Sequence, residues 1–178
     1  MQQEVLTFWF SELTPKQWFE VDEALDEHIR SRFAAIHAQA AQAELFSWRT
    51  TALGRLAEII VLDQFSRNLY RNQPGAFQQD ALALALAQEA VAVGADSQLS
   101  DDQRAFMYMP YMHSESQMIH QQALQLFNRP GLENNYQFEL RHKAIIDRFG
   151  RYPHRNAILG RPSSDEELAF LEQPDSAF

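Results

Sequence analysis

The sequence predicts an all-α fold, and three observations support this prediction. Apolar residues recur at helical spacing in almost every long segment, convincing apolar–polar alternation is missing, and helix-start and helix-stop residues separate the segments at short intervals. Helices joined by short turns normally pack as antiparallel pairs. We therefore expect about seven or eight helices in an antiparallel array or superhelix, forming a single domain over residues 1–178.

The first part of the chain predicts three helices, over about residues 3–12, 22–43 and 51–71. In the third helix, the apolar side continues into the charged residues Asp63 and Arg67, so we expect these two to be partly buried. The apolar positions expected to face the core are Val5, Phe8 and Trp9 in the first helix, Leu25, Ile29, Phe33 and Ile36 in the second, and Leu53, Leu56 and Ile60 in the third.

The middle of the chain predicts three more helices. The fourth covers about residues 76–93 and is closed by a glycine, which suits a left-handed C-terminal cap. Ser100 and Gln103 form a capping box that starts the fifth. Pro110 is expected to interrupt the fifth helix or to hand over to a sixth, which runs to about Phe127.

Two further helices complete the predicted array. The seventh covers about residues 132–149 and stops at Gly150. Ser164 and Glu167 form a second capping box, which starts a last short helix through Leu171. The sequence offers no linker long enough to divide the chain into two domains.

Composition limits the classes of protein to consider. The 178 residues, 46% of them hydrophobic, suffice for one buried core. The lack of cysteine excludes disulfides, thiolate metal sites and cysteine nucleophiles, and it fits a reducing compartment. No apolar stretch approaches the roughly 20 residues that span a bilayer, and the first residues lack the basic start of a signal peptide. We therefore expect a cytoplasmic protein with no membrane partner.

Charge argues against a nucleic-acid partner but allows a local anion site. The net charge of -9 repels phosphate backbones, so we expect no nucleic acid to bind. Residues 141–161 nevertheless carry six of the fifteen basic residues, with Asp147 as the only acid. A small anionic molecule or a peptide carboxylate is therefore a possible ligand of this segment.

Two Asp-x-Phe-x-Arg elements place a carboxylate and a guanidinium four residues apart. Asp63 precedes Arg67 in the first element, and Asp147 precedes Arg151 in the second. Residues at this spacing can meet on one face of a helix, so each pair can be a structural ion pair. Each can also belong to a ligand site, which would include the neighbouring Asn68.

The segment after the second element is expected to leave the helical path, because Gly150 permits a left-handed turn and Pro153 disfavours helix before it. Arg151 and Arg155 can then bind an anion, with Asn156 as a further donor and His154 as a proton donor or acceptor. The alternative is a structural role, in which these groups bond to helix carbonyls.

His113, Ser114 and Glu115 form a second candidate for proton transfer, near the expected start of the sixth helix. Glu115 is expected to cap the first turn of this helix and not to act as an acid catalyst. On one helix, His113 and His120 would lie about two turns apart, too far to share one metal ion. Phosphate-binding loops, dinucleotide fingerprints and zinc motifs are missing, so we expect no cofactor and no metal site.

Four motifs occur in order along the chain: Phe8-Trp9-Phe10, Leu62-Asp63-Gln64-Phe65-Ser66-Arg67-Asn68, Tyr111-Met112-His113-Ser114-Glu115, and Arg148-Phe149-Gly150-Arg151-Tyr152-Pro153-His154-Arg155-Asn156. Together they resemble the bacterial family called domain of unknown function 924, from Phe8 to about Phe170. The resemblance implies a helical fold similar to tetratricopeptide repeats. It implies no residue roles, because the activity of that family is not established. Ser66 stands where the family pattern usually has proline.

These observations leave three functional hypotheses. The first is a helical protein that binds a small anionic ligand or peptide carboxylate. The second is a metal-independent enzyme, in which a histidine acts as general acid or base on an anionic substrate. The third is a structural or scaffolding domain, expected if the polar groups pair internally and no cavity opens beside them. The candidate ligand-binding residues are Asp63, Arg67, Asn68, Arg151, Arg155 and Asn156, and the candidate catalytic residues are His113 and His154.

Overall fold

The computed structural model describes residues 1–174 and 176, and in them the chain forms eight α-helices and no strand. The all-α prediction and the expected number of helices are confirmed. The helices are α1 (Gln2–Thr7), α2 (Glu23–Ala41), α3 (Ala52–Leu69), α4 (Asp80–Ala92), α5 (Asp101–Met112), α6 (Gln117–Phe127), α7 (Glu133–Phe149) and α8 (Asp165–Leu171). A π-helical turn, η1 (Phe8–Glu12), extends α1, and short 3-10 turns lie at η2 (Phe46–Thr50), η3 (Pro74–Phe77), η4 (Ala95–Gln98) and η5 (Pro153–Arg155).

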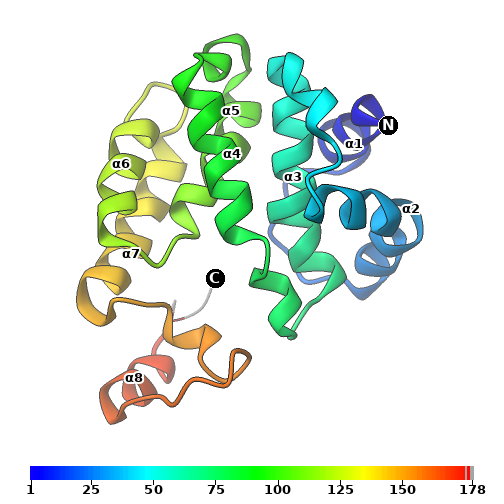
Figure 1. Ribbon diagram of the computed structural model, residues 1–178. Helices are drawn as coiled ribbons and strands as arrows, with labels where there is room; N and C mark the ends of the chain where they lie inside the picture. The colour runs from blue at the N-terminus through cyan, green and yellow to red at the C-terminus, as the bar shows by residue number, and fades with distance from the viewer. Residues whose placement is uncertain (175, 177–178) are drawn as a thin grey trace.

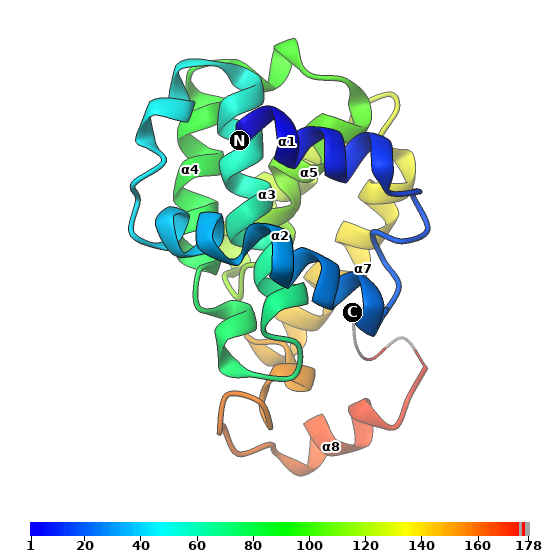
Figure 2. The ribbon, with the colours of Figure 1, turned by 90° about the vertical axis from the view of Figure 1, so that its right-hand side faces the viewer.

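Helix α3 lies at the centre of the N-terminal part of the array. It packs against α1 and α2 on one side and against α4 and α5 on the other (Figures 1 and 2). A helix with partners on several sides needs apolar residues around most of its circumference. The α3 sequence meets this need, since its fully buried residues include Leu56, Ile59, Ile60, Leu62 and Phe65.

Helices α5, α6 and α7 form the second part of the array, with α6 packed against both of its chain neighbours. The chain leaves α7 through η5 and reaches α8 at the lower end of the molecule in Figure 1. A small buried cluster of Ile145, Ile146 and Tyr152 lies at this exit. This route brings the basic segment after α7 close to the ends of α3, α4 and α5.

The helix signals read from the sequence act as expected. Ser100 with Gln103 and Ser164 with Glu167 form complete capping boxes at α5 and α8. Gly150 has φ of 70° directly after α7, a left-handed conformation that glycine adopts without a Cβ penalty. These local signals set the ends of the helices and, with them, the positions of the connecting loops.

Two details differ from the prediction. Pro110 does not end the fifth helix, because α5 continues to Met112 and the break comes at residues 113–116. Proline removes one N–H donor and crowds the carbonyl four residues earlier, and α5 accommodates both effects at Pro110. Leu53 is 41% exposed because it lies in the first turn of α3, beside a surface cavity instead of beneath a neighbouring helix.

No helix in the described part of the chain is both long enough and apolar enough to cross a bilayer.

Candidate functional site

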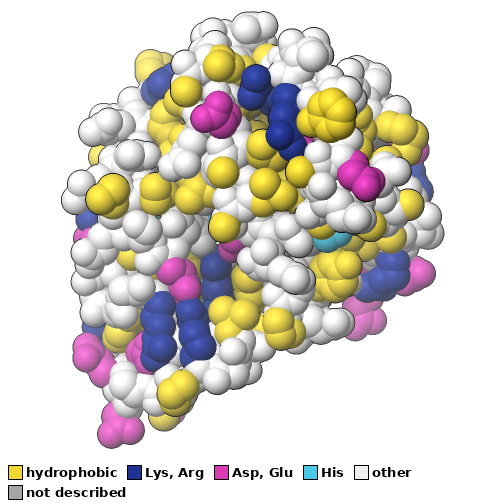
Figure 3. Space-filling model, viewed as in Figure 1, with side chains coloured by type: hydrophobic (Ala, Val, Ile, Leu, Met, Phe, Trp, Pro, Cys, Tyr) yellow, Lys and Arg dark blue, Asp and Glu magenta, His cyan; other side chains and the backbone are white. Residues whose placement is uncertain are grey.

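A cavity of about 630 Å³ opens where η3, the start of α4, the end of α5 and the segment after η5 meet. One part of its wall is apolar and consists of Pro74, Phe77, Ala81, Leu84, Pro110 and Leu159. The polar part consists of Gln78, Asp80, His113, Ser114, Glu115 and Arg155. Figure 3 shows basic and acidic side chains gathered at the lower left of this face, where the segment between α7 and α8 runs in Figure 1.

His113 is held in the cavity wall by a buried carboxylate. Its Nδ1 lies 2.7 Å from Asp63 Oδ1, and Asp63 is fully buried in α3. Burial would raise the pKa of the Asp63 carboxyl, but the facing His113 and the nearby Arg67 outweigh this effect, so its pKa lies below the usual value. An ionised carboxylate only accepts hydrogen bonds. His113 Nδ1 therefore carries a proton and donates a hydrogen bond to Asp63.

The second carboxylate oxygen of Asp63 accepts a hydrogen bond of 2.6 Å from Gln64 Nε2. Among the described residues, His113 Nε2 has no hydrogen-bond partner, and the His113 side chain is 18% exposed. In the neutral imidazole, the nitrogen opposite the protonated one carries a lone pair. The arrangement thus leaves Nε2 as the basic atom of a histidine that lines the cavity.

Asp80, the first residue of α4, joins the two arginines nearest the cavity. Arg67 Nη1 and Nη2 donate to its two oxygens at 2.7 and 3.0 Å, and Arg155 Nη1 donates to Oδ2 at 3.2 Å. Both guanidinium groups also lie over the Phe77 ring, at 4.8 Å for Arg67 and 4.6 Å for Arg155. One carboxylate therefore links α3, α4 and the segment after α7.

Glu115 forms another linked group in the cavity wall. Its carboxylate accepts two hydrogen bonds from Arg161, at 2.6 and 2.9 Å, and one of 2.7 Å from the Tyr152 backbone N–H. Burial would raise the pKa of Glu115, but Arg161 and the Tyr152 amide outweigh it, so this pKa is lowered. The prediction of a first-turn cap is wrong, because α6 begins only at Gln117 and Glu115 binds the C-terminal segment instead.

His154 differs from His113 in its surroundings. Its ring packs against Tyr152 with 5.6 Å between centroids, and its buried Nδ1 has no hydrogen-bond partner among the described residues. Burial and the neighbouring Arg155 lower its pKa to about 4. His154 is therefore neutral near pH 7 and is not part of the cavity wall.

The structure brings Asp63, Arg67, His113 and Arg155 together, but it places Asn68 elsewhere. The Asn68 amide donates 2.8 Å to the buried carboxylate of Asp26, which Arg71 also binds through two hydrogen bonds. This network joins α2 to the end of α3. The expectation that Asn68 and Arg67 lie in one ligand site does not match these contacts.

Arg151 and Asn156 are engaged within the C-terminal segment. Arg151 binds Glu167 of α8 through two hydrogen bonds, at 2.7 and 2.8 Å. Asn156 accepts from Arg161 at 3.0 Å and donates to Ser163 at 3.0 Å. These contacts give the two side chains a structural role between α7 and α8, although their partners are side chains and not the helix carbonyls that the alternative named.

Neither Asp-x-Phe-x-Arg element forms its internal ion pair. Asp63 and Arg67 pair with His113 and Asp80, as described above. In the second element, Asp147 pairs with Lys143, and Arg151 lies beyond the end of α7. Sequence reasoning gave no role to Asp80, because its expected fourth helix ran through η3. A break signal was present in Pro74-Gly75, which starts η3.

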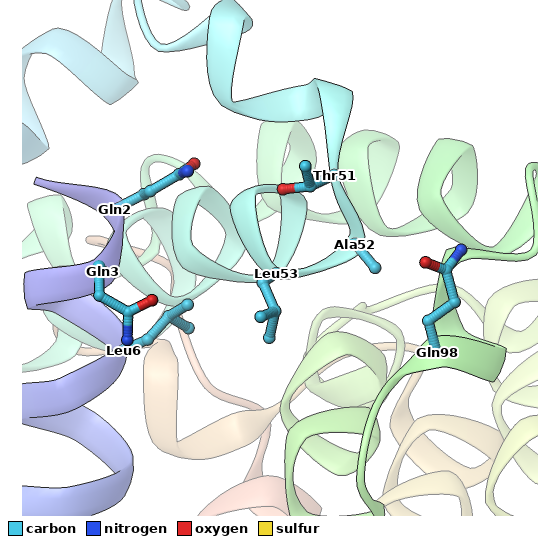
Figure 4. A pocket seen from close by; sticks show the side chains of 7 residues that line it. All are labelled: Gln2, Gln3, Leu6, Thr51, Ala52, Leu53 and Gln98. Carbon is cyan, nitrogen blue, oxygen red and sulfur yellow. The ribbon is translucent and has the colours of Figure 1, made fainter.

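A second cavity, of about 360 Å³, lies at the opposite end of α3 and is shown in Figure 4. Its wall consists of Gln2, Gln3, Leu6, Thr51, Ala52, Leu53 and Gln98. These residues offer hydrogen bonds and apolar surface but no ionisable side chain. Within the described residues, no cluster of three or more histidine or carboxylate side chains has the arrangement to hold a metal ion.

Comparison with protein families gives one match. The model of the bacterial proteins of unknown function DUF924 matches residues 5–175, which is nearly the whole chain. The chain belongs to the DUF924 family. The resemblance that the four sequence motifs indicated is thereby confirmed.

A solved structure of another protein is similar to this DUF924 chain. It is the protein of unknown function ATU0120 from Agrobacterium tumefaciens, with 38% sequence identity, a TM-score of 0.91 and 96% of each chain covered. A comparison with curated proteins finds no match. The helical fold is therefore shared with this protein of unknown function.

Proposed function

We propose that this DUF924 protein is a metal-independent enzyme in which His113 acts as general acid or base on a small anionic substrate. The observation that carries the proposal is the contact between His113 Nδ1 and the fully buried Asp63, which leaves Nε2 as the basic nitrogen of a side chain in the cavity wall. A carboxylate in this position fixes the tautomer and orientation of a histidine and stabilises the imidazolium that forms on proton uptake.

In the proposed reaction, His113 Nε2 removes a proton from the substrate or from a substrate-bound water, and it later returns the proton to the product. Asp63 remains ionised throughout, because its pKa is already lowered in the resting protein. Arg155, which lines the same cavity, orients the anionic group of the substrate. Histidine catalysis of this kind typically contributes about 10²-fold to 10⁴-fold to a rate.

The two other hypotheses fit the contacts less well. A site made only for anion binding would need free guanidinium groups, whereas Arg67 and Arg151 each already hold a carboxylate through two hydrogen bonds. A purely structural role would leave no cavity beside the polar cluster, yet one of about 630 Å³ is present. In the proposal, Arg155 is therefore the one arginine that binds the anionic group of the substrate.

The setting of the enzyme is also proposed from the sequence. The lack of cysteine suits a reducing compartment, and the net charge of -9 suits a small-molecule substrate. We therefore propose a cytoplasmic location without nucleic-acid or membrane partners. We also propose that the chain is a single domain and that its helical array resembles tetratricopeptide superhelices.

The test is a search for proton transfer that depends on His113. The purified protein is incubated in D₂O with pools of small carboxylates, carboxylic esters and phosphorylated metabolites. Proton NMR then follows both hydrolysis and the loss of exchangeable C–H signals. We expect at least one compound to react, with the rate falling about 100-fold or more in His113→Gln.

The control is Arg141→Gln, which changes an exposed arginine that contacts the Phe138 ring on α7. It should react like the unmodified protein. Full activity in a folded His113→Gln protein would contradict the proposal, as would the absence of any reaction across all pools.

A further inference from the structure

Arg155 is a buried cation that shares its carboxylate partner. Its side chain is only 7% exposed, and Asp80, the carboxylate to which it donates among the described residues, is already bound by Arg67 through two hydrogen bonds. The single contact from Arg155 to Asp80 is longer, at 3.2 Å. Burial and the nearby Arg67 lower the pKa of Arg155, although Asp80 and Glu115 act in the opposite direction.

The guanidinium of Arg155 also has unused donors. A guanidinium has five N–H groups. One hydrogen of Nη1 serves Asp80 and one of Nη2 serves the His113 carbonyl, at 2.9 Å, while the buried Nε has no partner among the described residues. Each terminal nitrogen therefore keeps a second hydrogen without a partner among the described residues, and Arg155 lines the cavity. A planar carboxylate can accept from two such donors at once.

The remaining walls select the kind of anion. Asp80 and Glu115 line the same cavity. A doubly charged phosphate there would be repelled by two carboxylates and attracted by Arg155, the one arginine among the described residues of the cavity wall. A singly charged carboxylate meets less repulsion. In the same cavity wall, Ala81 and Leu84 of α4 and Leu159 present apolar surface, which favours a hydrocarbon chain or ring.

We infer that the cavity takes an amphipathic monocarboxylate, with the carboxylate on Arg155 and an apolar body against Ala81, Leu84 and Leu159 of the cavity wall. The inference rests on the proposed function in treating the cavity as the substrate site. Arg155 and His113 line the same cavity, and Arg155 donates to the His113 backbone carbonyl, so we place the reacting atom of such a substrate near its carboxylate. The substrate class is thus a short-chain to medium-chain carboxylic acid that reacts close to its acid group.

The direct test uses isothermal titration calorimetry of the unmodified protein with four probes. Octanoate has both the acid group and the apolar chain, butyrate has little chain, 1-octanol lacks the charge, and octyl phosphate carries a double charge at pH 8. Octanoate should bind at least tenfold more tightly than each of the other three. Equal binding of octanoate and butyrate, or tighter binding of octyl phosphate, would overturn the inference.

Matched variants locate the binding. Ala81→Trp fills the apolar end of the cavity, whereas Ala85→Trp adds the same ring one turn further along α4, at an exposed position outside the cavity wall. Octanoate binding should be lost in the first and kept in the second. Equal binding by both variants would place octanoate elsewhere and refute the inference.

Variants of the polar end separate this inference from the proposed function. Arg155→Gln should weaken octanoate binding at least tenfold, while Arg141→Gln should leave it unchanged. His113→Gln should still bind octanoate although it lacks activity. An active protein that does not bind octanoate would refute the substrate class alone, whereas binding by a protein whose activity survives His113→Gln would refute the proposed function alone.

Discussion

At the scale of single residues, Asp63 shows how a buried charge is retained. A carboxylate removed from water costs several kcal/mol unless it is paired and hydrogen-bonded. Asp63 meets both conditions, through His113 on one oxygen and Gln64 on the other. The two residues therefore depend on each other, because removing either one leaves the other without its hydrogen-bond partner.

Removing one member of this pair should therefore cost more than removing both. We expect His113→Ala to lower the free energy of unfolding by about 3 to 5 kcal/mol, because it leaves the buried, ionised Asp63 without its histidine partner. Denaturant unfolding of this variant, of Asp63→Ala and of the double variant measures the coupling between the two residues. Additive losses would mean that the pair has no coupling and that Asp63 does not hold the histidine.

The residue scale also shows where sequence patterns stop being informative. The sequence predicted that Asp63 and Arg67 would lie on one buried side of a helix, and both bind residues of the cavity wall. It offered each as the other's partner, because four residues is the distance at which helix neighbours meet. The partners found, His113 and Asp80, come from other helices, and no local pattern contains that information.

At the scale of elements, α8 is attached mainly by polar contacts. Arg151 binds Glu167, and the Glu167 carboxylate also accepts from the Ser164 backbone N–H as part of the capping box. The hydrogen bond from Arg151 lowers the pKa of Glu167 to about 2. One side chain thus starts the helix and joins it to the end of α7.

This lowered pKa gives a pH dependence with a definite sign. The unfolded chain has an ordinary glutamate pKa of about 4.3, so the Glu167 carboxylate contributes its full stabilisation above that pH and loses it as the pH falls through about 2. At pH 7, amides of α8 should exchange faster in Glu167→Gln than in the unmodified protein. The difference should shrink towards zero as the pH is lowered to about 2.

A matched control exists next to this residue. Glu166 pairs with Arg148 near the surface, with the two side chains 64% and 47% exposed. Exposed pairs of this kind contribute little, about 0 to 1 kcal/mol. Glu166→Gln should therefore leave hydrogen exchange in α8 nearly unchanged. An equal effect of both substitutions would show that Glu167 has no special role in attaching α8.

Helix ends that carry a local capping signal were predicted well from the sequence. Both capping boxes and the Gly150 cap are local, since the residues that define them lie within four positions of the helix end. The break expected at Pro110 comes two residues later, because α5 includes Pro110 and ends at Met112. Proline removes one hydrogen bond within the helix, so packing decides whether the helix continues past it.

At the scale of the whole molecule, two histidines with lowered pKa values should make the fold sensitive to acid. Burial lowers the pKa of His142 to about 3, and burial together with Arg155 lowers that of His154 to about 4. In the unfolded chain both histidines have a pKa of about 6.5. Below that pH the unfolded state therefore binds protons that the folded state does not bind. Their contribution to stability is complete above pH 6.5 and is lost as the pH falls towards 4.

The free energy of unfolding should therefore fall between pH 6.5 and 4, by up to about 1.4 kcal/mol per pH unit for each histidine. His154→Gln should reduce this slope, since glutamine takes up no proton. Denaturant unfolding at several pH values measures both. An unchanged slope in the folded variant would mean that His154 takes up its proton equally well in the folded and unfolded states.

The cavity shares a wall with the last part of the chain, because Arg155 and Leu159 belong to the segment that Arg161 fastens to Glu115 and that leads on to α8. Occupancy of the cavity and attachment of the C-terminal segment are consequently linked equilibria. Any molecule that binds through Arg155 must favour the attached state by the same factor by which attachment strengthens its binding. Cleavage of residues 156–164 by a protease would then report on the ligand without any assay of turnover.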